Sequence, residues 1–435
     1  MRTIGVGLLG LGNVGSGVVK LLDDNQDAIT SRLGARVAVQ RIAVREADKP
    51  RLVDVDHALI TTDVEAVIAD PAVDVVVELV GGEELARRYV LSAIAKKKHV
   101  VTANKALLAV HGDEIFDAAE AAGVNVFYEA SVCGGVPIIR ALRDGLASDR
   151  IDQIIGIVNG TSNYILTRMV EEGLPFDEVL QDAQAKGFAE ADPALDVDGW
   201  DAAHKLCILV SLCFGVRVKL SDVKLVDGLR PIRAVDIAYA ERFGYVIKPL
   251  VIGRDHGETV EARVHPTMIP RRFLLAGVSG VFNAVYVSSQ ALGPSMYYGR
   301  GAGMMPTAVA VVSDVIDGAR DILAAAHSGV PMRLRVRDWH DRPIRDAGDL
   351  ESRYYLRAAV IDKPGVLAQL ARVLGDRAIS IREVVQSPDS DTAKGSATIV
   401  LTTHMARERD MQAALADFAK LDVVVEPPCL IRILD

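Results

Sequence analysis

The chain has 435 residues, of which 50% are hydrophobic and 25% charged, and its formal net charge is −9. This composition is typical of a globular protein with large cores, and the length predicts about three domains. An acidic balance without a basic block argues against nucleic acid as a partner. No apolar run approaches the roughly 18 residues that span a membrane, so no membrane association is expected. The 4 cysteines are scattered, which favours a reducing cytoplasm as the location.

The chain begins with a strand-like run that leads directly into a glycine-rich turn. The apolar run Thr3–Leu9 is followed by the GxGxxG sequence of residues 10–15, and a helical pattern starts at Ser16. In this fingerprint the first glycine makes a tight turn, the second admits a pyrophosphate, and the third packs helix on strand. The free backbone amides at the helix N-terminus can donate hydrogen bonds to the phosphates of the dinucleotide. The residues that we predict to bind a dinucleotide here are Gly10, Gly12, Asn13, Val14 and Gly15.

The residue after the second strand indicates which dinucleotide is bound. Arg45 is the first residue after a second apolar run, Arg36–Val44, and Glu46 follows it. An arginine at this position favours the 2′-phosphate of NADP(H), whereas an acid favours the ribose of NAD(H). Because Arg45 comes first, we predict that NADP(H) is preferred over NAD(H), with Glu46 as the alternative determinant.

Short apolar runs alternate with helical patterns through residue 135. This alternation predicts βαβ units in a doubly wound parallel sheet, so residues 1–135 form a dinucleotide-binding Rossmann domain. Ligands of such sheets gather at the carboxyl ends of the strands. Lys105 follows the strand-like run His99–Thr102 and is therefore expected near the nicotinamide and the substrate.

The pattern changes after residue 136. Helices followed by consecutive strands indicate an α+β substrate-binding and dimerisation domain over residues 136–325. Its last helix, Thr307–Leu323, is expected to pack back on the first domain, and the segment Tyr297–Pro306 to form a glycine-rich loop over the cofactor. A linker over 326–352 leads to residues 353–435, whose βαββαβ pattern predicts a ferredoxin-like module ending in a strand over Val423–Leu434.

An acidic segment ends in a lysine within the second domain. Between Glu190 and Asp201 the chain holds several carboxylates, and Lys205 lies one helical turn beyond Asp201. A lysine held among carboxylates stays protonated and can donate a proton to a carbonyl oxygen as a hydride arrives at the carbon. The carboxylates can also hold the ammonium group of an amino-acid substrate.

These residues carry a family resemblance. Ala183–Lys205 fits the pattern A-x3-G-[apolar]-[small]-x2-D-P-x2-D-[apolar]-x-G-x-D-x3-K, and the chain resembles bacterial homoserine dehydrogenases with a C-terminal ACT regulatory domain. The segments Val100–Ala109 and Gly299–Thr307 and the DKPGVL turn of the C-terminal module also look like that family. The resemblance implies reversible NAD(P)H-dependent reduction of L-aspartate 4-semialdehyde to L-homoserine, a step toward threonine, methionine and isoleucine.

The resemblance also implies roles for individual residues. Lys205 would be the proton donor, and Lys105 would have a catalytic role near the cofactor and the substrate. The implied substrate-binding acids are Glu190, Asp196 and Asp201, of which Asp201 would also serve catalysis. Gly187 and Gly303 would contact the cofactor. The positions matching a monovalent cation site, for Na⁺ or K⁺, are Glu129, Val132, Gly134 and Val136.

For the whole molecule the resemblance implies threonine as an effector at the ACT module and a homodimer or homotetramer. Two alternatives are open at this point. One is a catalytically inactive amino-acid sensor on a dehydrogenase scaffold. This alternative is disfavoured because the chain retains Lys205, Asp201 and Glu190. The other is an NAD(P)-dependent dehydrogenase that acts on another amino acid.

Overall fold

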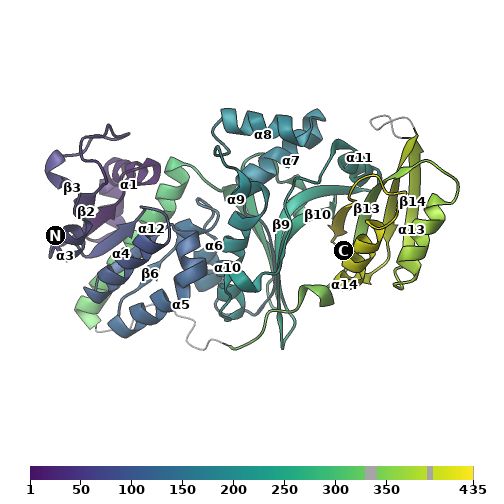
Figure 1. Ribbon diagram of the computed structural model, residues 1–435. Helices are drawn as coiled ribbons and strands as arrows, with labels where there is room; N and C mark the ends of the chain where they lie inside the picture. Colours follow the sequence, from purple (N-terminus) through teal and green to yellow (C-terminus); the bar gives the residue numbers. More distant parts are fainter. Residues whose placement is uncertain (329–339, 389–394, 435) are drawn as a thin grey trace. The chain divides into compact units, whose positions relative to one another are not determined.

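The computed structural model describes residues 1–328, 340–388 and 395–434, in two compact units. Unit 1 comprises Met1–Ile154, His204–Asp222 and Phe282–Arg342, and unit 2 comprises the remaining segments Ile155–Ala203, Val223–Val281 and Pro343–Asp435. Each unit therefore combines segments that lie far apart in the chain (Figure 1). The part of the expected linker over 329–339 lies outside the described residues. Within the described residues, no helix has both the length and the apolar character to cross a membrane.

Unit 1 contains a six-stranded sheet in the order β3-β2-β1-β4-β5-β6, in which every neighbouring pair is parallel. Its strands are β1 (Thr3–Leu9), β2 (Arg36–Ala43), β3 (Ile60–Thr61), β4 (Val75–Glu78), β5 (His99–Thr102) and β6 (Val126–Phe127). This order is that of a dinucleotide-binding Rossmann sheet and confirms the doubly wound prediction. β1 is buried at all but its first residue, which explains its unbroken apolar sequence.

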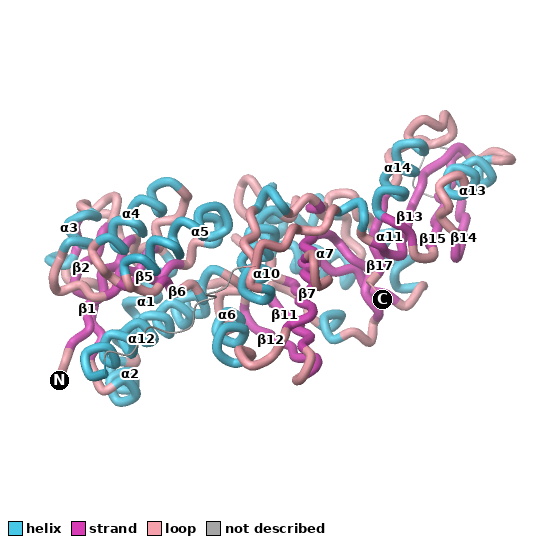
Figure 2. Tube along the Cα trace, turned by 90° about the horizontal axis from the view of Figure 1, so that it is seen from below, coloured by secondary structure: helices cyan, strands magenta, loops and turns pink. Residues whose placement is uncertain are grey.

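Helices cover both faces of this sheet (Figure 2). They are α1 (Asn13–Asp24), α2 (Gln26–Leu33), α3 (Val64–Ala69), α4 (Glu84–Ala95), α5 (Lys105–Ala122) and α12 (Met304–Ser328). One core joins the sheet to α1, α2 and α12, and a second joins it to α3, α4 and α5. The helix that ends the expected second domain thus packs on the Rossmann sheet. A Cβ on Gly17 of α1 would lie 2.9 Å from Ala308 Cβ, so glycine permits the close contact of α1 with α12.

The rest of unit 1 includes an antiparallel hairpin of β11 (Phe282–Ser289) and β12 (Gly293–Arg300). The expected glycine-rich loop from Tyr297 is therefore shorter, because Tyr297–Arg300 belong to β12 and pair with β11. The rings of Phe282 and Tyr298 stack across this pair with centroids 5.1 Å apart. The remaining helices and helical turns of this unit are α6 (Ile138–Arg140), η1 (His57–Leu59), η2 (Glu129–Ser131), η3 (Ala141–Gly145) and η4 (Leu220–Asp222). Two elements run from one unit into the other, β7 (Ile151–Ile157) and α10 (Trp200–Phe214).

Unit 2 is built on long strands in the order β9-β10-β17-β13-β15-β14. Their bounds are β9 (Tyr245–Asp255), β10 (Val260–Pro270), β17 (Cys429–Ile433), β13 (Glu351–Ile361), β15 (Ser396–Thr403) and β14 (Ile381–Pro388), and two short strands, β8 (Leu225–Val226) and β16 (Ala406–Arg407), pair with β10 and β13. The helices are α7 (Gly160–Glu172), α8 (Phe176–Ala185), α9 (Ala194–Val197), α11 (Ala234–Arg242), α13 (Val366–Gly375) and α14 (Glu408–Phe418), with short turns η5 (Leu274–Gly277) and η6 (Ala347–Asp349).

The last part of unit 2 has the predicted βαββαβ order, from β13 through α14 to β17. Its strands lie in the spatial order β17-β13-β15-β14, which confirms the ferredoxin-like module. The final strand is shorter than predicted and begins at Cys429, because Pro427 and Pro428 precede it and proline cannot donate to a strand ladder.

This module shares its sheet with the strands that precede it in the chain. β17 pairs in parallel with β10, with Arg432 opposite Thr267 and Ile433 opposite Met268. A single core also contains Tyr355 and Ile431 of the module together with Met268. The module is thus part of unit 2 rather than an appendage joined only by its linker.

Candidate active site

The glycine-rich turn after β1 has the geometry that a dinucleotide requires. Gly10 has a φ of 102°, and a Cβ there would lie 2.7 Å from the Leu79 carbonyl oxygen. A Cβ on Gly15 would lie 2.3 Å from the Gly10 carbonyl oxygen, whereas one on Gly12 would meet no atom within 4 Å. Two glycines therefore let the backbone fold closely, and the one between them leaves open the surface that a pyrophosphate would approach. Asn13 and Val14 begin α1 directly after this turn.

The segment after β2 carries the two residues expected to choose between the cofactors. Arg45 and Glu46 are both exposed, and the side chain of Arg51 donates to the Glu46 carbonyl oxygen. Arg45 thus stands on the surface just beyond the carboxyl end of β2, where a ribose phosphate would be met.

A buried acid organises the neighbouring edge of the same sheet, and sequence reasoning missed it. Glu78 ends β4, and its carboxylate accepts hydrogen bonds from Val80 N (2.9 Å) and from Thr102 Oγ1 (2.6 Å). Burial raises the pKa of this carboxyl group. An acid in the otherwise apolar run of residues 75–80 was the available signal, since buried acids need dedicated partners.

Lys105 is held at this edge by its helix. It is the first residue of α5, and the Asn104 side chain caps that helix by accepting from Leu107 N at 3.1 Å. The Asn104 amide also donates to the Gly82 carbonyl oxygen at 2.6 Å. The half-buried Lys105 therefore starts from a fixed point at the carboxyl ends of β4 and β5.

In unit 2 one asparagine joins two of the predicted substrate acids. Asn159 Nδ2 donates to Asp196 Oδ1 and to Asp201 Oδ2, each at 2.7 Å. Asn159 Oδ1 accepts from Ser162 N at 2.8 Å and so caps α7, which fixes the orientation of the amide. Sequence reasoning did not assign Asn159 to the site, although asparagine at the end of a strand and before a helix is a typical N-cap.

Glu190 lies in the turn between α8 and α9 and is exposed. The turn is anchored at two points: Thr161 Oγ1 donates to the Phe188 carbonyl oxygen at 2.6 Å, and Gln184 Nε2 donates to the Glu190 carbonyl oxygen at 3.1 Å. Gly187 has a φ of 73°, and a Cβ there would meet no atom within 4 Å, so this point of the turn is open.

Lys205 lies on α10, one turn after Asp201, as the spacing predicted. Asp201 is buried and Lys205 is half-buried. Gly199, with a φ of 91°, lies directly before α10 and allows this helix to begin at Trp200. The acid and the lysine therefore share one rigid element.

The predicted cation-site residues lie in one short segment of unit 1. The buried Glu129 carboxylate accepts from Ile139 N (2.9 Å) and Arg140 N (2.8 Å), at the start of α6. Gly134 has a φ of 45°, and a Cβ there would lie 2.4 Å from the Gly301 carbonyl oxygen. The turn around Gly134 thus packs on the loop before Gly303, whose φ is 122°.

Two observations concern the chemistry of this segment. Burial raises the pKa of the Glu129 carboxyl group, although the two backbone donors oppose that effect. Within the described ranges, no group of three or more His, Cys, Asp or Glu side chains could hold a metal ion. A cation here would therefore depend on backbone carbonyls together with Glu129.

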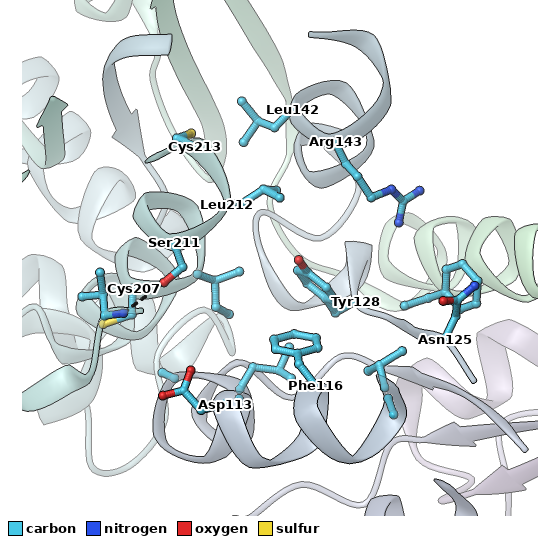
Figure 3. Close-up of a pocket in the computed structure, with 18 of the residues that line it drawn as sticks. Asp113, Phe116, Asn125, Tyr128, Leu142, Arg143, Cys207, Ser211, Leu212 and Cys213 are labelled. Carbon is cyan, nitrogen blue, oxygen red and sulfur yellow. Dashed lines mark hydrogen bonds between the residues drawn. The ribbon is translucent and has the colours of Figure 1, made fainter. Parts of the chain in front are cut away.

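Unit 1 also has a cavity of about 320 Å³, between α5 and α10 (Figure 3). Its walls include Phe116, Tyr128, Leu142 and Cys207, and none of the predicted site residues lines it. Burial raises the pKa of the Cys207 thiol to about 12, so this cysteine is not a nucleophile at neutral pH.

Two features define the class of this protein. They are the Rossmann sheet with its open glycine turn and the lysine and carboxylates of residues 190–205. The class is that of the NAD(P)-dependent oxidoreductases. Residues 10–129 match the family model "Homoserine dehydrogenase, NAD binding domain", residues 137–316 match "Homoserine dehydrogenase", and residues 354–423 match "ACT domain".

Individual relatives agree with these matches. The chain is 48% identical to the homoserine dehydrogenase of Synechocystis sp., covering 99% of this chain and 100% of that protein. It is 42% identical to the Bacillus subtilis enzyme, over 100% of this chain and 99% of that one. A crystal structure of the Thiobacillus denitrificans homoserine dehydrogenase aligns with a TM-score of 0.92 at 46% identity, covering 100% of this chain and 99% of that one. The chain belongs to the homoserine dehydrogenase family, which sets aside both alternatives raised from the sequence.

Proposed function

We propose that the chain reduces L-aspartate 4-semialdehyde to L-homoserine, reversibly and with NADPH, as a step toward threonine, methionine and isoleucine. The observation that carries this proposal is the pair of carboxylates, Asp196 and Asp201, that Asn159 holds together at 2.7 Å from its amide nitrogen. Two carboxylates fixed beside one another suit the ammonium group of an amino-acid substrate. α7 begins at Gly160, directly after Asn159, and the amides at a helix N-terminus suit the substrate carboxylate.

The same residues supply the proton chemistry. When bound, the nicotinamide cofactor supplies the hydride that reaches the aldehyde carbon. Lys205 donates a proton from Nζ to the aldehyde oxygen, which becomes the hydroxyl of homoserine. Asp201, one helical turn before Lys205, and Glu190, in the exposed turn, bind the substrate. Lys105, at the edge of the Rossmann sheet, has a catalytic role near the cofactor and the substrate.

The cofactor proposal rests on Gly12 and Arg45. The open surface at Gly12 fits a pyrophosphate, and the exposed Arg45 beyond β2 supports NADP(H) over NAD(H). Gly187 and Gly303, both with positive φ, are proposed to contact the cofactor through their backbones.

A monovalent cation, Na⁺ or K⁺, is proposed beside the Glu129 carboxylate, with backbone oxygens of Val132, Gly134 and Val136. Support comes from the burial of this carboxylate, because a cation would offset the cost of keeping it charged.

For regulation we propose threonine as the effector of the ACT module, in a homodimer or homotetramer. The turn of residues 362–365 ends at Gly365, with a φ of 87°, and α13 begins at Val366. Amides at this helix start suit an amino-acid carboxylate. Calorimetric titration of the full-length chain with L-threonine tests the proposal, and the absence of binding heat would contradict it.

The substrate proposal is tested by comparing L-homoserine with 4-hydroxybutanoate, which lacks the ammonium group. Two charge-assisted hydrogen bonds are worth roughly 1.5–3 kcal/mol each, so kcat/KM is expected to fall by about 10²-fold or more. Asp201→Asn should reduce this discrimination. Asp192→Asn, an exposed acid of the same segment, is the matched control and should preserve it. Oxidation of 4-hydroxybutanoate within tenfold of the rate for homoserine would overturn the proposal.

A further inference from the structure

Arg432 of the last strand is an arginine that is 2% exposed and bound to two carboxylates. Its Nε donates to Glu408 Oε2 at 2.8 Å, and its Nη2 also donates to Glu408. Its third nitrogen, Nη1, donates to Asp227 Oδ2 at 2.6 Å. Arg432 and Glu408 belong to the ACT module, whereas Asp227 belongs to the segment before α11. One buried guanidinium therefore joins the module to the substrate-binding part of unit 2.

The orientation of Arg432 is fixed from the side of the module. Glu408 is 3% exposed, and its carboxylate also accepts from Tyr354 Oη (2.9 Å) and Gln412 Nε2 (2.8 Å). Because a planar guanidinium that binds a carboxylate through two nitrogens cannot rotate freely, Nη1 is aimed at Asp227.

The segment that begins at Asp227 in turn holds the end of the acidic segment. Leu229 N donates to the Val197 carbonyl oxygen at 2.8 Å, and Arg230 Nε donates to Asp198 Oδ1 at 2.6 Å. A Cβ on Gly228 would lie 2.6 Å from the same Val197 oxygen, so glycine allows this close approach. Residues 227–230 and 196–198 thus pack directly against each other.

The held stretch, residues 196–198, includes one of the substrate acids. Asp196 is the first residue of the held stretch, and Asn159 joins its carboxylate to that of Asp201. Asp227 and Asp196 also line the same small cavity, of about 20 Å³. A displacement of Asp227 would therefore also displace Asp196, through the backbone contacts and through the shared wall of the cavity.

We propose that Arg432 and Asp227 are positioning residues, through which the ACT module holds Asp196 and the acidic segment in the geometry that binds substrate. This inference rests on the function proposed above. The module then contributes to substrate affinity even when no effector is bound.

Asp227→Ala tests the proposal, with Asp227→Asn as a milder variant in case the first does not fold. Glu426→Ala is the matched control. The Glu426 carboxylate also bridges the module and the substrate-binding part, accepting from Arg357 Nη1 (3.2 Å) and Arg233 Nη1 (2.6 Å), but its link leads to α11. Wild-type activity is measured first, and its absence would contradict the proposed function rather than this inference.

The expected result is a KM for aspartate 4-semialdehyde about tenfold higher in Asp227→Ala, with kcat and the Kd for NADPH within about twofold of wild type. Amide hydrogen exchange in residues 190–198 should rise in Asp227→Ala and not in Glu426→Ala, a readout that does not depend on activity. A KM within twofold of wild type in both Asp227 variants, or an equal rise in Glu426→Ala, would overturn the proposal.

Discussion

At the scale of single residues, Asn159 connects features that the sequence presents separately. Helical spacing alone placed Lys205 one turn from Asp201, and the structure agrees. The link from Asp201 to Asp196 could not be predicted in that way, because it passes through an amide 42 residues from Asp201 along the chain. Glu78 is a similar case, since its partner Thr102 comes from the neighbouring strand. Local spacing thus revealed the charged groups of the site, whereas the polar groups that orient them depend on long-range packing.

We expect a single side chain, Arg45, to decide the choice of cofactor. Arg45→Ala should weaken NADPH binding at least tenfold and NADH binding by no more than about twofold, because the lost contact is to the 2′-phosphate alone. Fluorescence titration with each cofactor measures both affinities. Arg41→Ala is the control, since Arg41 is also exposed on β2 but pairs with Asp70 at 2.9 Å. An equal loss for NADPH and NADH would instead assign the choice to Glu46.

At the scale of elements, apolar runs predicted the strands of the Rossmann sheet except the two-residue β3, and also the order of elements in the C-terminal module. It failed where a short sequence had two interpretations. Glycine and tyrosine at 297–300 suggested a loop, but cross-strand stacking of Tyr298 on Phe282 places them in β12. The cap of α6 could not be predicted either, because Glu129 supplies it from ten residues before Ile139.

Glu129→Gln tests this capping element and the cation proposal together. A glutamine offers one acceptor oxygen in place of two, so one backbone N–H at the start of α6 loses its partner. We expect the free energy of unfolding to fall by about 1–3 kcal/mol, measured by urea denaturation. Any dependence of Tm on Na⁺ or K⁺ should also disappear. Glu178→Gln, an exposed acid of α8, is expected to change neither quantity. Retention of the cation dependence in Glu129→Gln would place the cation elsewhere.

At the scale of the whole molecule, the sequence presents three successive domains, whereas the structure combines segments across their expected boundaries. α12 returns to the Rossmann sheet, and β17 returns to pair with β10. The return of α12 was expected from the sequence, whereas the pairing of β17 with β10 has no local signal, because the two strands are more than 150 residues apart. The buried Arg432 depends on the second of these pairings, so the proposed influence of the ACT module on the substrate could not be found before the fold was known.

The most direct test of the whole account is the rate of NADPH oxidation on addition of aspartate 4-semialdehyde, with homoserine quantified as product, in wild type and Lys205→Ala. We predict equal amounts of NADPH consumed and homoserine formed in the wild type. Turnover should fall by about 10²–10⁴-fold in Lys205→Ala, the usual contribution of a general acid, with NADPH affinity nearly unchanged. Lys224→Ala, which removes an exposed lysine, should behave as wild type. A Lys205→Ala protein that keeps more than half of the wild-type turnover would contradict the account.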